Sequence, residues 1–361
     1  MFIHGGNLHS AARRLGCAPS RIQDASASLI PFSLPLRLRL SSLLTDYSCY
    51  PDVTYHHLRD SIGSYHSLPA DYILPGNGAS ELITWAARDA AAIGISLLPS
   101  PTFADYIRAL RLWSAQFSTY LYPFTPLTSY HDTFICPPDL PGDVIWITNP
   151  HNPTGHLWTP EALQPLLDRF RLVIVDESFL PIVNADESLS VSPLVVRNDR
   201  LIVLRSLTKA FAIPGLRFGY AIAAPDRLRC WQAVRDPWPV NAIASQFAIN
   251  LLDHPSFYLD WLQRLQAWSA LERSWLTRQI DLHTNLQTFP SSSNYFLVHS
   301  TPDSPTQSLE ALRVSMEVRY RILLRTCTNF DGLGSSWLRI SLSTRHLNER
   351  LFSALRTLAP A

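Results

Sequence analysis

The chain contains a single lysine, Lys209, and every other basic residue is arginine or histidine. Lys209 ends the segment Arg-Ser-Leu-Thr-Lys, and Arg217 follows it eight residues later. A primary amine can attack a carbonyl carbon and form an imine, which a guanidinium group cannot do. The hydroxyl groups of Ser206 and Thr208 and the guanidinium of Arg217 can hold a phosphate. A lone lysine is usually a solvated surface residue, but these neighbours indicate imine chemistry next to a bound phosphate.

Two further polar segments each follow a short apolar run. Asp176 and Glu177 end the run at 172–175, and the segment Asn-Pro-His-Asn-Pro-Thr-Gly, which contains Asn152, follows the run at 144–148. Open α/β sheets bind ligands at the carboxyl ends of their strands, so both segments are candidates for a ligand site. A carboxylate beside a pyridine ring keeps the ring nitrogen protonated, and a protonated ring draws electrons as a pyridoxal electron sink requires. Asp176 is the candidate for that task.

A glycine-rich turn, Pro-Gly-Asn-Gly-Ala-Ser-Glu, precedes an amphipathic stretch at 80–92. Glycines let backbone N–H groups approach an anion closely, and the N-terminus of a helix favours a phosphate. Gly78, Ala79 and Ser80 are therefore candidates for phosphate binding. Taken alone, the turn is more typical of an ordinary loop that begins a helix.

Short apolar runs alternate with amphipathic stretches through the middle of the chain. The expected strands lie at 95–98, 117–121, 144–148, 172–175, 201–205 and 218–223, and the expected helices at 80–92, 103–113 and 160–170. This alternation indicates βαβ crossovers, and so an α/β fold with a mostly parallel sheet and helices on both faces.

The pattern changes after Pro239. A long helix is expected at 256–281, followed by short strands at 295–299, 322–325 and 338–342, with helices from about 306 and 347. This pattern predicts a second, smaller α/β unit. We therefore divide the chain into an N-terminal arm at 1–45, which belongs to the small domain, a large domain at 46–239 and a C-terminal small domain at 240–361.

Composition excludes several classes of function. The net charge is +1, so no basic surface indicates nucleic acid or an anionic membrane as a partner. No apolar run reaches the roughly 18–20 residues of a membrane helix, and the first residues do not resemble a signal peptide. The five cysteines are scattered and form no CxxC pair, which indicates neither a zinc site nor a disulfide framework. We expect a cytoplasmic protein without a metal.

The order of these segments resembles the fold-type I pyridoxal-phosphate enzymes, in particular the histidinol-phosphate aminotransferase branch. Within that branch the chain is most similar to the threonine-phosphate decarboxylases of cobalamin biosynthesis. The similarity covers essentially the whole chain. The segments that carry the decarboxylase likeness lie at 4–7, 11–16, 50–58, 103–106, 204–220, 237–241 and 321–327.

The resemblance implies pyridoxal 5'-phosphate as the cofactor and assigns its contacts. Lys209 matches the lysine that forms the Schiff base with the cofactor and later moves protons at the substrate Cα. Asp176 matches the partner of the pyridine nitrogen, Asn152 the partner of the 3-oxygen and Phe103 the aromatic residue stacked on the ring. The phosphate cup matches Ala79, Ser80, Ser206, Thr208 and Arg217, with Gly78 just before it.

The resemblance also implies a homodimer with shared active sites and a small phosphorylated amino acid as substrate. Tyr50 matches a tyrosine that reaches the cofactor phosphate from the neighbouring subunit. Arg339 matches the arginine that binds the substrate α-carboxylate, for which a bidentate guanidinium is well suited. His4 and Arg325 match positions at the substrate's phosphate end, although Arg325 could also be a surface residue and His4 a mobile terminal one.

The sequence departs from the decarboxylases at three positions near the expected site. Ser28 and Ile30 replace two asparagines, the first of which helps to hold the substrate; Ser28 is a shorter hydrogen-bond donor. His151 replaces a third asparagine. Phe179, in contrast, stands where many aminotransferases have tyrosine and where the decarboxylases have phenylalanine.

The resemblance implies decarboxylation of L-threonine O-3-phosphate to (R)-1-aminopropan-2-yl phosphate and CO2. The main alternative is a histidinol-phosphate aminotransferase, which would use the same cofactor residues but break the Cα–H bond and require a 2-oxo acid such as 2-oxoglutarate. A third interpretation is a cofactor-binding protein that has lost catalysis. The intact set of Lys209, Asp176, Asn152 and Arg339 argues against it.

Overall fold

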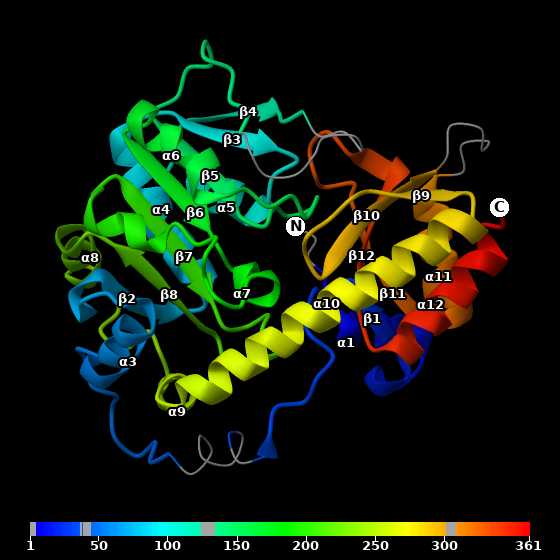
Figure 1. Ribbon diagram of the computed structural model, residues 1–361, viewed down its shortest axis with the longest axis horizontal. Helices are drawn as coiled ribbons and strands as arrows, with labels where there is room; N and C mark the ends of the chain where they lie inside the picture. The colour runs from blue at the N-terminus through cyan, green and yellow to red at the C-terminus, as the bar shows by residue number, and fades with distance from the viewer. Residues whose placement is uncertain (1–4, 37, 39–44, 124–133, 301–307) are drawn as a thin grey trace.

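The computed structural model describes residues 5–36, 38, 45–123, 134–300 and 308–361 of the 361-residue chain. Its strands form two separate sheets, one of seven strands and one of five, with helices packed against both (Figure 1). This arrangement confirms the predicted α/β fold.

The larger sheet has the strand order β2-β8-β7-β6-β5-β3-β4. Strands β7, β6, β5, β3 and β4 run parallel to one another, whereas β8 is antiparallel to both of its neighbours. The sheet is therefore mostly parallel. Its strands are β2 (Ile73–Asn77), β3 (Ser96–Ser100), β4 (Phe117–Leu121), β5 (Val144–Thr148), β6 (Leu172–Asp176), β7 (Leu201–Ser206) and β8 (Phe218–Ala223).

The central strands read as continuous apolar runs because both faces of the sheet are covered. In β5, Val144 and Trp146 belong to one hydrophobic cluster, and Ile145 and Ile147 belong to another on the opposite face. The covering helices are α3 (His56–His66), α4 (Ala79–Ile93), α5 (Ala104–Leu112), α6 (Pro160–Arg169), α7 (Leu180–Val183), α8 (Pro225–Gln232) and α9 (Ala242–Leu252).

The smaller sheet has the order β1-β11-β12-β10-β9 and includes a strand from the N-terminal segment. Strand β1 (Gln23–Ala25) pairs in parallel with β11, about 300 residues later in the chain. The remaining strands are β9 (Leu286–Thr288), β10 (Tyr295–Ser300), β11 (Ile322–Thr326) and β12 (Trp337–Ser341), and the associated helices are α1 (Leu8–Leu15), α11 (Leu309–Tyr320) and α12 (Arg345–Leu358).

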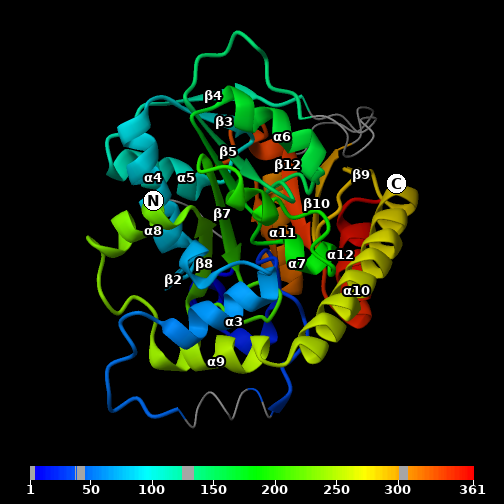
Figure 2. The same cartoon turned by 60° about the vertical axis from the view of Figure 1, so that its left-hand side comes forward.

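One long helix, α10 (Pro255–His283), lies along both halves of the molecule. It runs from α9, beside the large sheet, to α12 and β9, beside the small sheet (Figures 1 and 2). The Trp261 indole donates to the Ala210 carbonyl at 2.9 Å, and the Trp268 indole donates to the Ser343 carbonyl at 3.2 Å. The helix thus contacts elements from both sheets.

Strand β2 is one of several elements that the sequence analysis missed; the helices α3 and α9 are others. It contains Pro75 and Gly76, which argue against a strand because proline cannot donate to a ladder and glycine lacks a packing side chain. The structure places β2 at the edge of the sheet, paired only with β8, and an edge position tolerates proline.

None of the helices within the described residues is both long enough and apolar enough to cross a membrane.

Candidate active site

A cavity of about 200 Å³ lies between the two sheets, at the carboxyl ends of β5, β6 and β7. Residues from both sheets line it, and many of them are residues that the sequence analysis singled out. The predicted residues that line this cavity are Ser28, Ala79, Ser80, Phe103, Asn152, Asp176, Ser206, Thr208, Lys209, Arg217, Arg325 and Arg339. Distant segments of the chain therefore meet at one place.

Asp176 is the last residue of β6 and is buried beneath the cavity. The Tyr106 hydroxyl donates to its Oδ2 at 2.9 Å, and the Ser178 amide donates to its Oδ1 at 3.0 Å. Burial raises the pKa of Asp176, and these hydrogen bonds act in the opposite direction because they stabilise the charged form.

Lys209 lies in the turn after β7, with its side chain partly buried in the wall of the cavity. Its Nζ is 5.6 Å from the centre of the Phe179 ring. Desolvation lowers the pKa of Lys209 to about 8; the charges of Arg339 and Arg217 add to this effect, and Asp176 opposes it. About a tenth of the amine is therefore neutral, and so nucleophilic, at pH 7, far more than for an ordinary lysine.

The turn before α4 forms a narrow cradle. Gly78 caps the helix with φ +74°, a conformation that favours glycine, and a Cβ atom there would lie 2.5 Å from Nη2 of Arg217. Ser80, in the first turn of α4, and Ser206 and Thr208, after β7, also line the cavity. The helix N-terminus, the hydroxyls and the guanidinium together make a site of the kind that binds phosphate.

Arg339 projects from β12 into the cavity and is buried. Its Nη1 donates to Asn152 Oδ1 at 2.6 Å and its Nη2 to the Ser26 carbonyl at 3.0 Å. Its Nε is buried and has no hydrogen-bond partner among the described residues. Its Cζ lies 4.8 Å from the centre of the Tyr295 ring. A buried guanidinium with an unused donor indicates a site for an anion.

Arg325 is the register partner of Arg339 across β11 and β12, so two like charges meet at the same cavity. Arg325 Nη2 donates to Asn329 Oδ1 at 3.0 Å, and its Cζ lies 5.2 Å from the Phe330 ring centre. Burial lowers the pKa of Arg325 to about 10, and Arg339 adds to this effect. Like charges directly opposite one another are destabilising, so an anionic ligand would relieve their repulsion.

Two predicted residues, Gly78 and Tyr50, do not line the cavity, and two others, Ser28 and His4, differ from the rest in other ways. Tyr50 is 78% exposed, lies outside the cavity lining and stacks on Trp238 at 4.4 Å between ring centres. Ser28 lines the cavity, but its Oγ is hydrogen-bonded to Ser341 Oγ at 2.9 Å. His4 lies outside the described residues.

The structure also brings residues to the site that the sequence analysis did not select. Thr148 and Ser178 line the cavity beside Asp176, and Tyr106 lies directly behind that carboxylate. The sequence analysis placed Tyr106 in an expected helix and in one of the segments that carry the family resemblance, but it gave the residue no task, because a buried aromatic residue of a helix needs no functional explanation. Within the described ranges, no group of three or more His, Cys, Asp or Glu side chains could hold a metal ion.

These features fit pyridoxal 5'-phosphate. The cavity offers an amine with a lowered pKa and a buried carboxylate, and Gly78 lies beside it, next to the guanidinium of Arg217. Phe103, at the N-cap of α5, also lines the cavity and can supply an aromatic face.

Comparison with known proteins agrees with this fit. Residues 41–355 match the family model described as aminotransferase class I and II. The chain is 31% identical to the threonine-phosphate decarboxylase of Salmonella typhimurium over 375 residues, covering 99% of this chain and 98% of that protein.

Two solved structures extend the comparison. The histidinol-phosphate aminotransferase of Clostridium acetobutylicum is 26% identical, with a TM-score of 0.79, over 93% of this chain and 99% of that one. The histidinol-phosphate aminotransferase of Sinorhizobium meliloti, solved in complex with pyridoxal 5'-phosphate, also has a TM-score of 0.79, over 99% of this chain and 96% of that one. At 17% identity the latter is a likeness of fold alone.

Proposed function

This chain is a pyridoxal-phosphate-dependent enzyme of the class I and II aminotransferase family, and we propose that it decarboxylates L-threonine O-3-phosphate. The products are (R)-1-aminopropan-2-yl phosphate and CO2, and the pathway served is cobalamin biosynthesis. Full-length similarity to a threonine-phosphate decarboxylase supports this choice within the family.

The observation that carries the proposal is the pair of arginines that face one cavity from adjacent strands. Arg325 and Arg339 are register partners, and both are buried. The proposed substrate has a carboxylate at one end and a phosphate at the other. Two guanidinium groups at one cavity suit such a doubly anionic molecule, because each can make paired hydrogen bonds to an anion.

Each residue then has a defined task in the proposed reaction. Arg339 binds the α-carboxylate and orients the bond that breaks, and Arg325 binds the phosphate end. When bound, pyridoxal phosphate supplies an electron sink for the charge left on Cα. Lys209 holds the cofactor and afterwards delivers a proton to Cα. Asp176 would pair with the ring nitrogen. Asn152, whose Oδ1 accepts a hydrogen bond from Arg339, would also hold the cofactor's 3-oxygen.

The same residues would serve a histidinol-phosphate aminotransferase, which is the second candidate. The 26% identity to the solved enzyme of Clostridium acetobutylicum favours it. That reaction requires a 2-oxo acid acceptor, whereas decarboxylation requires none. Dependence on 2-oxoglutarate therefore separates the two candidates.

We also propose that the protein works as a cytoplasmic homodimer with shared active sites. Tyr50 is exposed and lies outside the cavity of its own chain, which is compatible with a role in the partner's site. Sedimentation of the purified protein at working concentration should give the mass of two chains. A monomer that turns over substrate at full rate would contradict the shared site.

The deciding experiment mixes the purified protein, pyridoxal phosphate and L-threonine O-3-phosphate without any 2-oxo acid, and follows the products by mass spectrometry. We expect aminopropanol phosphate and CO2. The proposal fails if neither product forms and the protein instead transfers the amino group of histidinol phosphate to 2-oxoglutarate.

A further inference from the structure

Helix α5 places one phenol group against the ends of two strands beneath the active site. The Tyr106 hydroxyl lies 2.9 Å from Asp176 Oδ2 and 2.7 Å from Thr148 Oγ1. Thr148 and Asp176 are register partners at the ends of β5 and β6. Tyr106 is 1% exposed and does not line the cavity, so any effect on a bound ligand must pass through its neighbours.

The direction of these hydrogen bonds follows from the chemistry of the three groups. An ionised carboxylate can only accept, so Tyr106 donates its single hydroxyl proton to Asp176. The phenol oxygen then accepts a hydrogen bond from the Thr148 hydroxyl. Burial raises the pKa of Tyr106, and the charge of Asp176 adds to this effect, so the phenol remains a donor throughout the working pH range.

We propose that Tyr106 is a positioning residue that holds Asp176 ionised and in a fixed orientation toward the cofactor's ring nitrogen. Asp176 is buried, and burial without hydrogen bonds would favour its neutral form, which cannot pair with a protonated ring nitrogen. Tyr106 binds one carboxylate oxygen and the Ser178 amide the other, which leaves the carboxylate little freedom to rotate.

Other charged and titratable groups act on Asp176 from the surrounding elements. Asp105, also on α5, disfavours its charge. Lys209, in the turn after β7, interacts favourably with it, and Tyr295, on β10, also lies within its electrostatic reach. Tyr106, unlike these groups, donates a hydrogen bond to the carboxylate itself, so its removal should act most directly.

Tyr106 also contacts the residue expected to stack on the cofactor. Its ring meets that of Phe103 edge-on, with 5.5 Å between ring centres and an interplanar angle of 86°. On its other side it packs against Trp146 at 5.1 Å. One side chain therefore contacts both the carboxylate that would pair with the ring nitrogen and the aromatic residue that would stack on the ring.

The test is Tyr106→Phe, which removes the hydroxyl and keeps the ring. The dissociation constant of pyridoxal phosphate is measured by tryptophan fluorescence between pH 5 and 9, without substrate. We expect the affinity for pyridoxal phosphate to weaken about tenfold. The acid midpoint of cofactor binding, the pH at which half of the affinity is lost on acidification, should rise by about one unit, because a hydrogen bond to a charged group typically contributes about the free energy of one pH unit. The readout needs only the family's cofactor and is independent of the proposed decarboxylation.

Two further variants keep the result interpretable. Tyr258→Phe removes a buried hydroxyl that has no hydrogen-bond partner among the described residues, and it should leave both affinity and midpoint unchanged. Thr148→Val removes the hydroxyl that donates a hydrogen bond to Tyr106. It should also raise the acid midpoint of cofactor binding, but by less than Tyr106→Phe does. The proposal would be overturned if Tyr106→Phe left the acid midpoint of cofactor binding where it is in the wild type. This holds whether the affinity for pyridoxal phosphate is unchanged or is weakened equally at every pH.

Discussion

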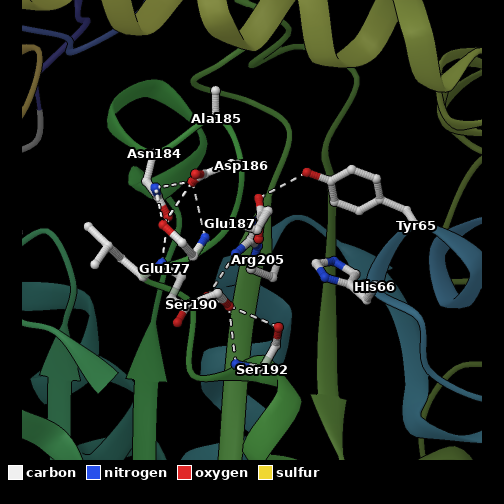
Figure 3. Close-up of polar contacts among 12 residues, drawn as sticks. Tyr65, His66, Glu177, Asn184, Ala185, Asp186, Glu187, Ser190, Ser192 and Arg205 are labelled. Atoms are coloured by element: carbon white, nitrogen blue, oxygen red, sulfur yellow. Dashed lines mark hydrogen bonds and ion pairs between the residues drawn. The ribbon is translucent and has the colours of Figure 1, made fainter. Parts of the chain in front are cut away.

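Arg205 and Glu177 form an ion pair in which both side chains are almost completely buried, with 2.7 Å between Nη1 and Oε2. Arg205 also pairs with Glu187, whose Oε1 accepts a hydrogen bond from the Tyr65 hydroxyl at 3.0 Å. Figure 3 shows Arg205 between these carboxylates and the side chains of α3. Because Glu177 follows Asp176 and Arg205 precedes Ser206, the pair joins two strand ends that form the active site.

This pair leads to a prediction about stability. Arg205→Gln leaves Glu177 buried without a counter-charge, and we expect it to lower the free energy of unfolding by about 3–5 kcal/mol. Arg264→Gln breaks an ion pair with Asp260 whose side chains are 75% and 53% exposed, and it should cost no more than about 0.5 kcal/mol. Urea denaturation measures both values. If both variants lost the same free energy of unfolding, burial of the Arg205–Glu177 pair would be unimportant for stability.

The lowered pKa of Lys209 predicts how cofactor attachment depends on pH. Only the neutral amine reacts, so the attachment rate should rise about tenfold per pH unit below the pKa and become constant above about pH 8. Absorbance after mixing the cofactor-free protein with pyridoxal phosphate measures the rate. Lys209→Ala should show no attachment and no turnover. A wild-type rate that still climbs at pH 10 would mean that the cavity does not perturb this amine.

Arg339 is expected to control affinity for the substrate carboxylate. Arg339→Lys keeps the charge but removes the paired donors, and KM for L-threonine O-3-phosphate should rise roughly 10- to 100-fold. Steady-state kinetics measure the change, and the dissociation constant of pyridoxal phosphate should change much less. Arg278→Lys, at an exposed position of α10, is the control. Unaltered KM in the Arg339 variant would assign the carboxylate to another residue.

Two glycines near Arg217 make a matched pair for testing the phosphate cradle. A Cβ at Gly78 would lie 2.5 Å from Arg217 Nη2, and the positive φ there adds strain, whereas a Cβ at Gly215 would meet nothing within 4 Å. Gly78→Ala should therefore weaken pyridoxal phosphate binding about tenfold, since displacing Arg217 removes a charged hydrogen bond. Gly215→Ala should bind normally. Equal affinities in fluorescence titrations would place the phosphate elsewhere.

The sequence predicted strands best where the pattern of apolar residues within a segment matches the burial of that segment in the fold. The predicted strands at 117–121, 144–148 and 218–223 coincide with β4, β5 and β8. For β5 and β8 the reason is burial on both faces, which requires a strand that is apolar throughout. The site segments could be found for a related reason. Each follows a strand or precedes a helix, and those ends converge in an open α/β sheet.

Features that depend on distant pairing could not be found in this way. Strand β1 has three residues and is recognisable only from its partner β11. The Arg205–Glu177 pair joins adjacent strands 28 residues apart, and nothing near either residue indicates the other. The hydroxyl of Tyr106 depends in the same way on the packing of α5 against β5 and β6.

Because Lys209 is the only lysine of the chain, proteolysis at this residue can report local unfolding of the native protein. A lysine-specific protease has one bond to cut, between Lys209 and Ala210, and would release fragments 1–209 and 210–361. Ala210 is fully buried, and its carbonyl accepts a hydrogen bond from Trp261 on α10. Cleavage therefore requires this turn to detach from that helix, and at high protease concentration its rate measures how often the detachment occurs.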